Sequence, residues 1–206
     1  SVFCPYGIDT AEITMIGREL LSLVGCTIQW VIEPASNCYR TGNHLGIQPH
    51  GFKDSLEFAA GELEELTGVR IEIPIDRKGA EVLLVVPSAD YFGTPHYYTL
   101  LGYLMVLREA GLDYTFSSFA SEGGNFGLFA SHDLMKRLNA KIYEAARRLG
   151  VKWILGGECG HMWRVVHQYM GTMNGPANFL EVPVSPVTGT RFAHAAATRM
   201  VHVCEF

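Results

Sequence analysis

The chain has 206 residues, of which 48% are hydrophobic and 18% are charged, and its formal net charge is −5. This ordinary globular composition suits one domain or a domain with a short arm, and a weakly acidic chain without a basic block argues against nucleic acid as a partner. No apolar run approaches the ~18 residues that a bilayer-spanning helix needs, and no N-terminal signal pattern is present, so we expect no direct membrane span.

Residues 9–24 are predicted to form the first helix. Apolar residues recur in it at spacings of three and four, Asp9 or Thr10 can cap its start, and Gly25 can end it. The chain opens inside a cysteine motif without an initiator Met and closes on a strand-like run. We therefore expect a segment of a longer protein.

Residues 26–50 are interpreted as a linker with little regular structure. They contain Pro34 and a polar stretch rich in Asn, Gly and His, in which His44 is interpreted as a surface or capping residue. A second helix is expected at about 51–67, and Gly68 can end it.

Beyond this helix, segments typical of strands and helices alternate along the chain. The predicted strands are 69–75, 81–86, 114–119, 151–156, 179–184 and 200–206, and the predicted helices are 95–110, 131–149 and 161–170. Such alternation predicts an α/β fold with a mostly parallel sheet and helices on both faces.

Right-handed crossovers place the C-terminal ends of parallel strands at one edge of the sheet. Three loops, at 87–91, 121–124 and 157–161, should therefore lie side by side at this edge. Open α/β sheets bind their ligands in this region, which makes the three loops the candidate site.

The third loop contains the most informative motif, because an apolar strand ends in two glycines and then in Glu158, Cys159 and His161. Cys159 precedes a predicted helix, whose N–H groups and dipole would lower a thiol pKa, and His161 could assist. Cys159 with Glu158 and His161 is therefore the candidate catalytic group, and Cys159 is also a candidate metal or iron–sulfur ligand. The structural alternative is a thiol that packs as a small hydrophobic side chain beside a tight turn.

The glycine loop at 123–127 resembles a dinucleotide-binding loop only vaguely, because the first glycine of that fingerprint is missing. Turns that need a positive φ explain these glycines more simply. We therefore favour a turn over a nucleotide site.

The five cysteines are widely spread, which favours a reducing compartment over a disulfide framework. Cys4 precedes a proline, as does the last cysteine of bacterial-type ferredoxin motifs, and is a candidate cubane ligand. The other three have no partner spacing, so their roles stay open; Cys26 and Cys204 are expected to be buried and Cys38 to be more exposed.

Four stretches resemble one known family, the K subunit of the dissimilatory sulfite-reduction membrane complex (DsrK). They are SVFCPYGIDTAEI, NCYRTGNHLGI, ILGGECGHMWRVVHQY and FLEVPVSPVTGTRF, and the resemblance covers essentially all 206 residues. DsrK proteins are heterodisulfide-reductase-like iron–sulfur subunits. The resemblance implies a ferredoxin-like region with two [4Fe-4S] clusters, followed by two cysteine-rich CCG domains.

By this resemblance, residues 1–25 are the tail end of the ferredoxin-like region, 26–68 are a linker and helix, and 69–206 are a first CCG-like domain. A full CCG module has cysteines after each of three strands. This sequence has Ser88-Ala89-Asp90 and Ser121-Glu122-Gly123 at the first two positions. At the third it keeps Cys159 but has Met162 where a second cysteine is expected.

The resemblance therefore implies a degenerate CCG half that walls an active-site cleft, with Cys159, Glu158 and His161 at the cleft edge and Cys4 as an iron–sulfur ligand. It implies a cytoplasmic oxidoreductase subunit held at the inner face of the membrane by its complex. The implied partners are a membrane quinone module and a small carrier protein with a disulfide or trisulfide (DsrC-like), and the direction of electron flow stays open.

Two alternatives remain beside that interpretation. Residues 1–206 alone are expected to be inactive, and whether they bind any cluster is open. They can instead be a non-catalytic scaffold that shapes the cleft and binds partner subunits. A weaker alternative is a thiol enzyme that uses Cys159 and His161.

Overall fold

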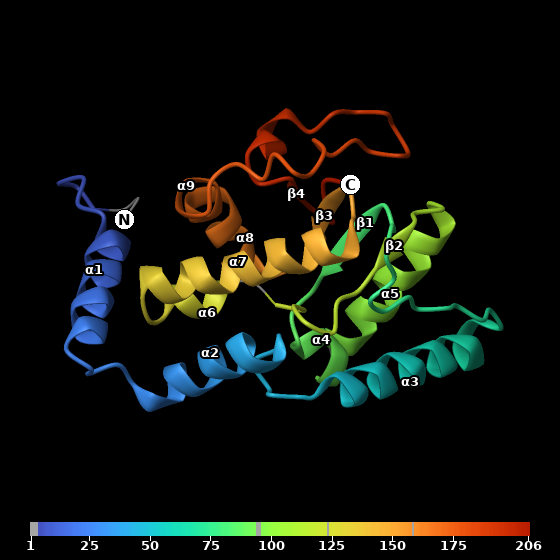
Figure 1. Cartoon of the computed structure of the whole chain (residues 1–206), viewed down its shortest axis with the longest axis horizontal. Helices are drawn as coiled ribbons and strands as arrows, with labels where there is room; N and C mark the ends of the chain where they lie inside the picture. Colours follow the sequence, from blue (N-terminus) through green and yellow to red (C-terminus); the bar gives the residue numbers. More distant parts are fainter. Residues whose placement is uncertain (1–3, 94–95, 123, 158) are drawn as a thin grey trace.

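The computed structural model describes residues 4–93, 96–122, 124–157 and 159–206. These residues form an α/β fold around a four-stranded sheet with the order β2-β1-β3-β4, in which all neighbouring strands are parallel (Figure 1). The strands are β1 (Val82–Val85), β2 (Tyr114–Thr115), β3 (Trp153–Gly156) and β4 (Met200–His202). The predicted fold class and parallel sheet are confirmed.

Helices cover both faces of this sheet and extend beyond it. The α-helices are α1 (Thr10–Leu23), α2 (Gln29–Thr41), α3 (Pro49–Thr67), α4 (Ala89–Phe92), α5 (His96–Glu109), α6 (Asn125–Leu128), α7 (His132–Leu149), α8 (Gly160–Val165) and α9 (Gly171–Met173). A π-helical turn, η1 (Val166–Met170), continues α8, and a 3-10 turn, η2 (Ala193–Ala196), precedes β4.

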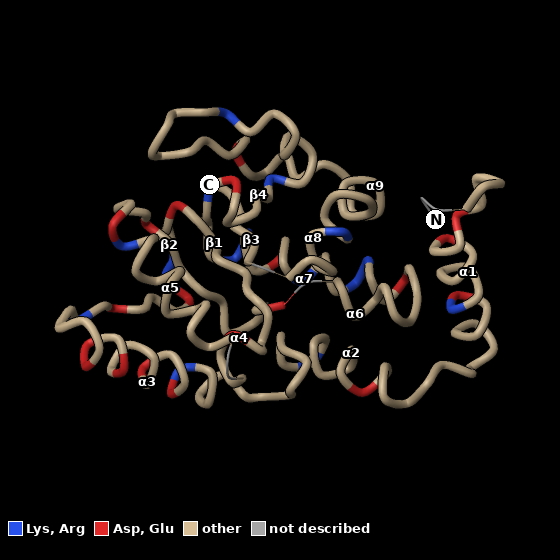
Figure 2. The backbone as a smooth tube through the Cα atoms, turned by 180° about the vertical axis from the view of Figure 1, so that it is seen from behind, with Lys and Arg blue, Asp and Glu red and all other residues tan. Residues whose placement is uncertain are grey.

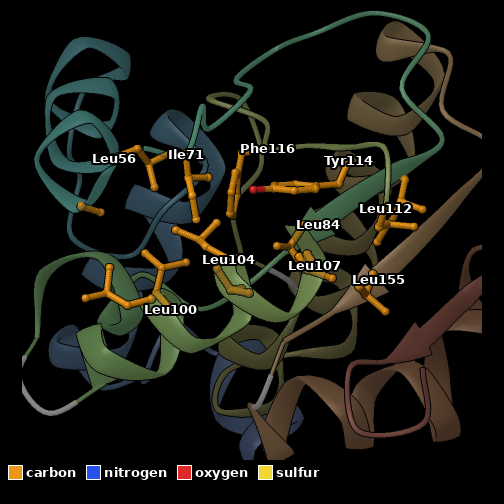
Figure 3. Packing of buried hydrophobic residues seen from close by; sticks show 14 of the residues in the cluster. Leu56, Ile71, Leu84, Leu100, Leu104, Leu107, Leu112, Tyr114, Phe116 and Leu155 are labelled. Carbon is orange, nitrogen blue, oxygen red and sulfur yellow. The ribbon is translucent and has the colours of Figure 1, made fainter. Parts of the chain in front are cut away.

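The sheet is buried on both faces, as parallel sheets require. Alternate residues of β1 face opposite sides, so Val82 and Leu84 pack against α3 and α5, while Leu83 and Val85 pack against α7 and α8. Figure 3 shows the first of these clusters, in which leucines of α5 and Leu56 of α3 gather around Phe116.

The expected start and end signals are present at helices α1 and α7. The Asp9 carboxylate accepts hydrogen bonds from the backbone N–H of Ala11 (2.9 Å) and Glu12 (3.3 Å) at the start of α1. The Ser131 hydroxyl caps α7 by accepting from Leu134 N at 3.2 Å, and Gly150 ends α7 with φ 68°.

Four predicted strands are wrong in part. The strand predicted at 114–119 is reduced to β2, Tyr114–Thr115. Residues 69–75 form only an isolated bridge between Ile75 and Phe116, because Pro74 lacks the N–H that a continuous ladder needs. Residues 179–184 form only one bridge, from Val184 to Arg191. The last predicted strand is reduced to β4, because the chain turns directly after it, with Glu205 N donating to His202 O at 2.9 Å.

The segment 26–50, which we expected to have little regular structure, contains the thirteen-residue helix α2. Pro34 lies inside α2 and removes one backbone donor. Tertiary packing compensates, because Ala35 and Cys38 are buried on the face of α2 that lies toward α6 and α7. We name residues 26–48, with α2 at their centre, the arm.

Helix α1 lies at one end of the molecule, away from the sheet, in both views (Figures 1 and 2). Its only buried residue is Met15, and the apolar stripe that includes Ile13, Ile16 and Leu20 is more than half exposed. The periodic pattern therefore predicts the helix but not a surface that covers it. Among the described residues, no helix has the length and apolar character that crossing a bilayer requires.

Gly42 joins the arm to the loop that follows β2. Its carbonyl accepts hydrogen bonds from the backbone N–H of Ser121 (3.0 Å) and Glu122 (3.1 Å). Its φ is 83°, and a Cβ at this position would lie 2.3 Å from the Phe119 carbonyl oxygen. The arm can approach the loop this closely only because residue 42 has no side chain.

We expect Gly42→Ala to destabilise the fold more than Gly68→Ala. Both glycines end a helix with positive φ, but Gly68 has open space where a Cβ would lie. The left-handed conformation should cost about 1–2 kcal/mol in each variant. The clash in Gly42→Ala should add about 1–3 kcal/mol. Urea unfolding measures both values, and equal losses would contradict the close contact between arm and loop.

Candidate functional site

The loops that follow β1, β2 and β3 lie side by side at one edge of the sheet, as the strand order requires. Gly157 N donates to Val85 O at 2.7 Å, which joins the third loop to the end of β1. Ser88 N donates to the Glu122 carboxylate at 3.0 Å, which joins the first loop to the second. The predicted gathering of the three loops is therefore confirmed, with the β1 loop in the centre.

The Glu122 side chain makes the hydrogen bonds that connect the segments at this edge, and it is only 2% exposed. Besides Ser88, it accepts hydrogen bonds from the backbone N–H of His44 at 2.5 Å and from His44 Nδ1 at 2.9 Å. The Cys38 thiol lies 3.6 Å from Oε2 and donates to it. One carboxylate thus joins two strand loops to the arm.

These contacts decide the charge state of Glu122. Burial raises its pKa, but the hydrogen bonds and electrostatic interaction with His44 and the hydrogen bonds from Ser88 outweigh burial, so the pKa lies below its ordinary value. Burial and the neighbouring Glu122 carboxylate raise the pKa of Cys38 well above its ordinary value. Cys38 therefore stays a neutral thiol here and does not act as a thiolate nucleophile or ligand.

The β1 loop is closed by aromatic packing as well as by polar contacts. Asp90, on α4, is fully buried. The neighbouring Tyr91 ring packs edge-on against Phe52 of α3, with 4.7 Å between the ring centroids. Burial first, and then the charges of Asp90 and Glu122, raise the pKa of Tyr91, so its hydroxyl stays protonated.

Cys159 lies at the other side of this edge, at the N-cap of α8. It is partly buried and packs, with Phe119 and Trp163, against the cluster between the sheet and α7. Two interpretations of Cys159 were open: a thiol at a helix N-terminus, or a thiol that packs as a small apolar side chain. The structure shows both features together.

The two glycines before Cys159 serve close packing of the strands. A Cβ at Gly157 would lie 2.5 Å from Val86 Cγ1, and one at Gly156 would lie 2.8 Å from Met200 Cε. The space beside both glycines is therefore filled by side chains of β1 and β4 or their ends. The two glycines allow β3 to lie close to its neighbouring strands. Close packing therefore explains why residues 156 and 157 are glycines, and no bound ligand is needed for this explanation.

The structure gives less support to the other two members of the candidate catalytic group, His161 and Glu158. His161 is exposed on α8, and its ring lies 5.5 Å from the Phe129 ring, centroid to centroid. Glu158, named from the sequence, lies outside the described residues. Cys159 and His161 are near neighbours in sequence, and their pairing as a nucleophile and its base stays a prediction.

An iron–sulfur cluster is held by about four cysteine thiolates, and the described residues do not supply such a set. Within residues 4–93, 96–122, 124–157 and 159–206, no group of three or more His, Cys, Asp or Glu is arranged to hold a metal ion. Cys4 is partly exposed, and Cys26 and Cys204 are exposed while Cys38 is buried, the reverse of our expectation for these last three. No cluster chemistry is derived from these residues.

Sequence reasoning missed the role of His44 and the importance of Glu122. His44 lies in a polar stretch and was interpreted as a surface residue, but it bonds Glu122 through its backbone and ring. A weak signal existed, since Glu122 follows a predicted strand at the edge where loops meet. An acidic residue there needs partners, yet nothing in the sequence identifies the arm as their source.

Comparison with known proteins finds two similar chains. One is the Hdr-like menaquinol oxidoreductase iron-sulfur subunit of Archaeoglobus profundus, which is 50% identical over 185 residues, 88% of this chain and 33% of its own length. The other is the Hdr-like menaquinol oxidoreductase iron-sulfur subunit 2 of Archaeoglobus fulgidus, which is 45% identical over all of this chain and 40% of its own length.

The chain thus spans about a third to two fifths of the length of these relatives. No family model matches the chain, and no solved structure matches it. The similarity supports an Hdr-like iron–sulfur subunit, as the sequence motifs implied. Neither relative is named as a K subunit of sulfite-reduction complexes, so that narrower assignment stays a proposal.

We expect Glu122→Gln to lower the free energy of unfolding at pH 7 by about 2–3 kcal/mol, because buried charge-assisted hydrogen bonds are weakened. The pKa of Glu122 is lower in the folded chain than the unfolded value of about 4.3. The stabilisation is therefore complete above that value and is lost as the pH falls through the folded-state pKa. Urea denaturation at several pH values should show that the free energies of unfolding of wild type and Glu122→Gln converge at acid pH.

The matched control is Glu109→Gln, because Glu109 is exposed and pairs with the adjacent Arg108. This substitution should change stability by less than about 0.5 kcal/mol at every pH. A constant difference between wild type and Glu122→Gln from pH 7 to pH 3 would refute the proposed charge state.

Proposed function

We propose that this chain is part of an iron–sulfur electron-transfer subunit related to the Hdr-like menaquinol oxidoreductases that it resembles in sequence. The observation that carries the proposal is 45–50% identity, over nearly the whole chain, to about a third of such subunits. The subunit would pass electrons between a membrane quinone module and a protein disulfide or trisulfide. The narrower assignment to a K subunit in dissimilatory sulfur metabolism rests on the four sequence motifs.

Within that subunit, residues 69–206 would form a CCG-like half that walls a cleft rather than holding a cluster. The support is chemical, because the loops after β1 and β2 carry Asp90 and Glu122 where the family pattern has cysteines. Three groups of the arm and one of the loop after β1 already bond to the Glu122 carboxylate. A carboxylate so engaged contributes to structure and is a poor substitute for a soft thiolate.

Cys159 then remains as the thiol of this half at the cleft edge, with Glu158 and His161 as its neighbours in sequence. Cys4, in residues 1–25, is proposed as one ligand of a [4Fe-4S] cluster, with its other ligands outside this chain. Residues 26–68 would connect the two regions. In the cell, we expect the subunit on the cytoplasmic face of the membrane, among other subunits of a redox complex and a DsrC-like carrier.

The second candidate function is a scaffold domain that binds partner subunits without a cofactor of its own. The engagement of Glu122 and the absence, among the described residues, of a group arranged to hold a metal ion favour it for residues 69–206 taken alone. The two candidates are compatible, because the subunit can transfer electrons while this part of it only shapes the cleft.

In the complete subunit, isolated anaerobically and reduced, Cys4→Ser should remove or alter one cubane signal in the EPR spectrum. Replacing a thiolate ligand by a harder oxygen ligand changes the cluster or its potential. Cys26→Ser is the matched control, because Cys26 is an exposed cysteine near the same end of the chain. An unchanged spectrum for Cys4→Ser would defeat the assignment of Cys4.

For the 206-residue chain expressed alone, we expect iron and acid-labile sulfide near zero per chain. The reason is that the described residues bring no set of thiolates together. Chemical analysis after anaerobic reconstitution provides the measurement. Stoichiometric iron and sulfide that survive gel filtration would show that the chain holds a cluster by itself, and would reject the scaffold role.

A further inference from the structure

A cavity of about 410 Å³ lies between the arm and the body of the molecule, and Cys159 is not among the described residues that line it. The arm contributes Arg40, Thr41 and Gln48 to its wall. The body contributes Arg148 of α7 and the loop after β2, including Ser117 and Phe119. This volume lies within the range of small-molecule sites in proteins.

The residues that line this cavity carry a net positive charge, whereas the whole chain is negatively charged. Three cationic side chains, Arg40, Lys78 and Arg148, line it, against one carboxylate, Asp76. The chain as a whole carries a net charge of −5. Most acidic residues of nearby α3 lie farther along that helix, and its first turn contains none (Figure 2).

Both guanidinium groups belong to exposed residues, and each makes a contact that leaves donors available. The Arg148 guanidinium lies over the Phe119 ring, 4.7 Å from its centroid, and Lys141 lies over the same ring at 4.3 Å. Stacking uses the face of the guanidinium and leaves its N–H edge for other partners. Arg40 donates through one nitrogen to Asn37 Oδ1 at 2.8 Å.

The single carboxylate is already engaged. Asp76 accepts hydrogen bonds from the Ser118 backbone N–H at 3.0 Å and from the Ser118 hydroxyl at 2.5 Å. It therefore neutralises the three cations only in part. Cations that share one cavity repel each other, and an anion placed among them removes this repulsion.

We propose that this cavity binds an oxyanion, a phosphate or sulfate group that is either a free ion or the terminal group of a larger molecule. Guanidinium groups suit such a ligand because they bind its oxygens in pairs. The ligand would contact the arm through Arg40 and the body through Arg148. It would therefore also stabilise the docked arm by mass action.

The test measures binding of inorganic phosphate, and separately of sulfate, by calorimetry at constant ionic strength. Arg40→Gln and Arg148→Gln should each weaken binding at least about tenfold, since each removes charge-assisted hydrogen bonds. The matched control is Arg147→Gln, which removes the same charge from the next residue of α7. Arg147 stacks on Phe179 and does not line the cavity, so affinity should stay within about twofold.

A second variant guards against effects of misfolding. Asp76 has φ 54°, a conformation that Asn adopts readily, so Asp76→Asn should fold normally. It removes the one carboxylate that lines the cavity among the described residues and should therefore tighten phosphate binding. A gain in affinity cannot result from loss of structure.

Co-sedimentation with phosphatidylcholine vesicles that contain phosphatidate tests whether the group is a lipid headgroup. Binding of phosphate identifies a free ion or small molecule, and binding of these vesicles alone identifies a headgroup. Either result supports the site if Arg40→Gln and Arg148→Gln weaken it. Binding of neither probe, or equal losses in Arg147→Gln and Arg148→Gln, would overturn the proposal, whatever the cluster content of the subunit.

Discussion

The arrangement of this molecule depends on one buried carboxylate. Glu122 is withdrawn from water, and such a group is tolerated only when hydrogen bonds replace its hydration. Its partners come from two regions far apart in sequence: the arm, through the thiol of α2 and the loop after α2, and the turn after β1. Satisfying one charge therefore fixes the position of the arm against the ends of β1 and β2.

Because the arm is fixed in this way, the two sides of the edge where ligands of α/β folds bind differ in how far they are covered. On the side of β1 and β2, the arm and α3 cover the loops, and Asp90, Tyr91 and Glu122 are all buried. On the side of β3, Cys159 remains partly exposed at the start of α8. The order of strands changes direction between β1 and β3, which is where an open α/β sheet leaves a crevice. The partly exposed Cys159 therefore lies on the β3 side of this edge.

The elements governed by local pattern could be predicted from the sequence. The apolar runs of β1 and β3, the serine cap and glycine end of α7, and the crossover order specify a parallel sheet without tertiary information. Helix α2 was missed because Pro34 and its polar surroundings indicate a loop, whereas burial of Ala35 and Cys38 stabilises a helix. Residues 69–75 were misjudged because alternation selects a face but does not supply a partner strand.

The sequence by itself determined the α/β class, the edge at which three loops meet, and the isolation of Cys159 among residues that are not cysteine. Only the tertiary structure decided which of these loops is open, because His44 and Cys38 reach Glu122 across about eighty positions of chain. The physical reason is that helices and strands follow from interactions between near neighbours in sequence. Burial of a charge depends instead on partners that only the folded chain brings together.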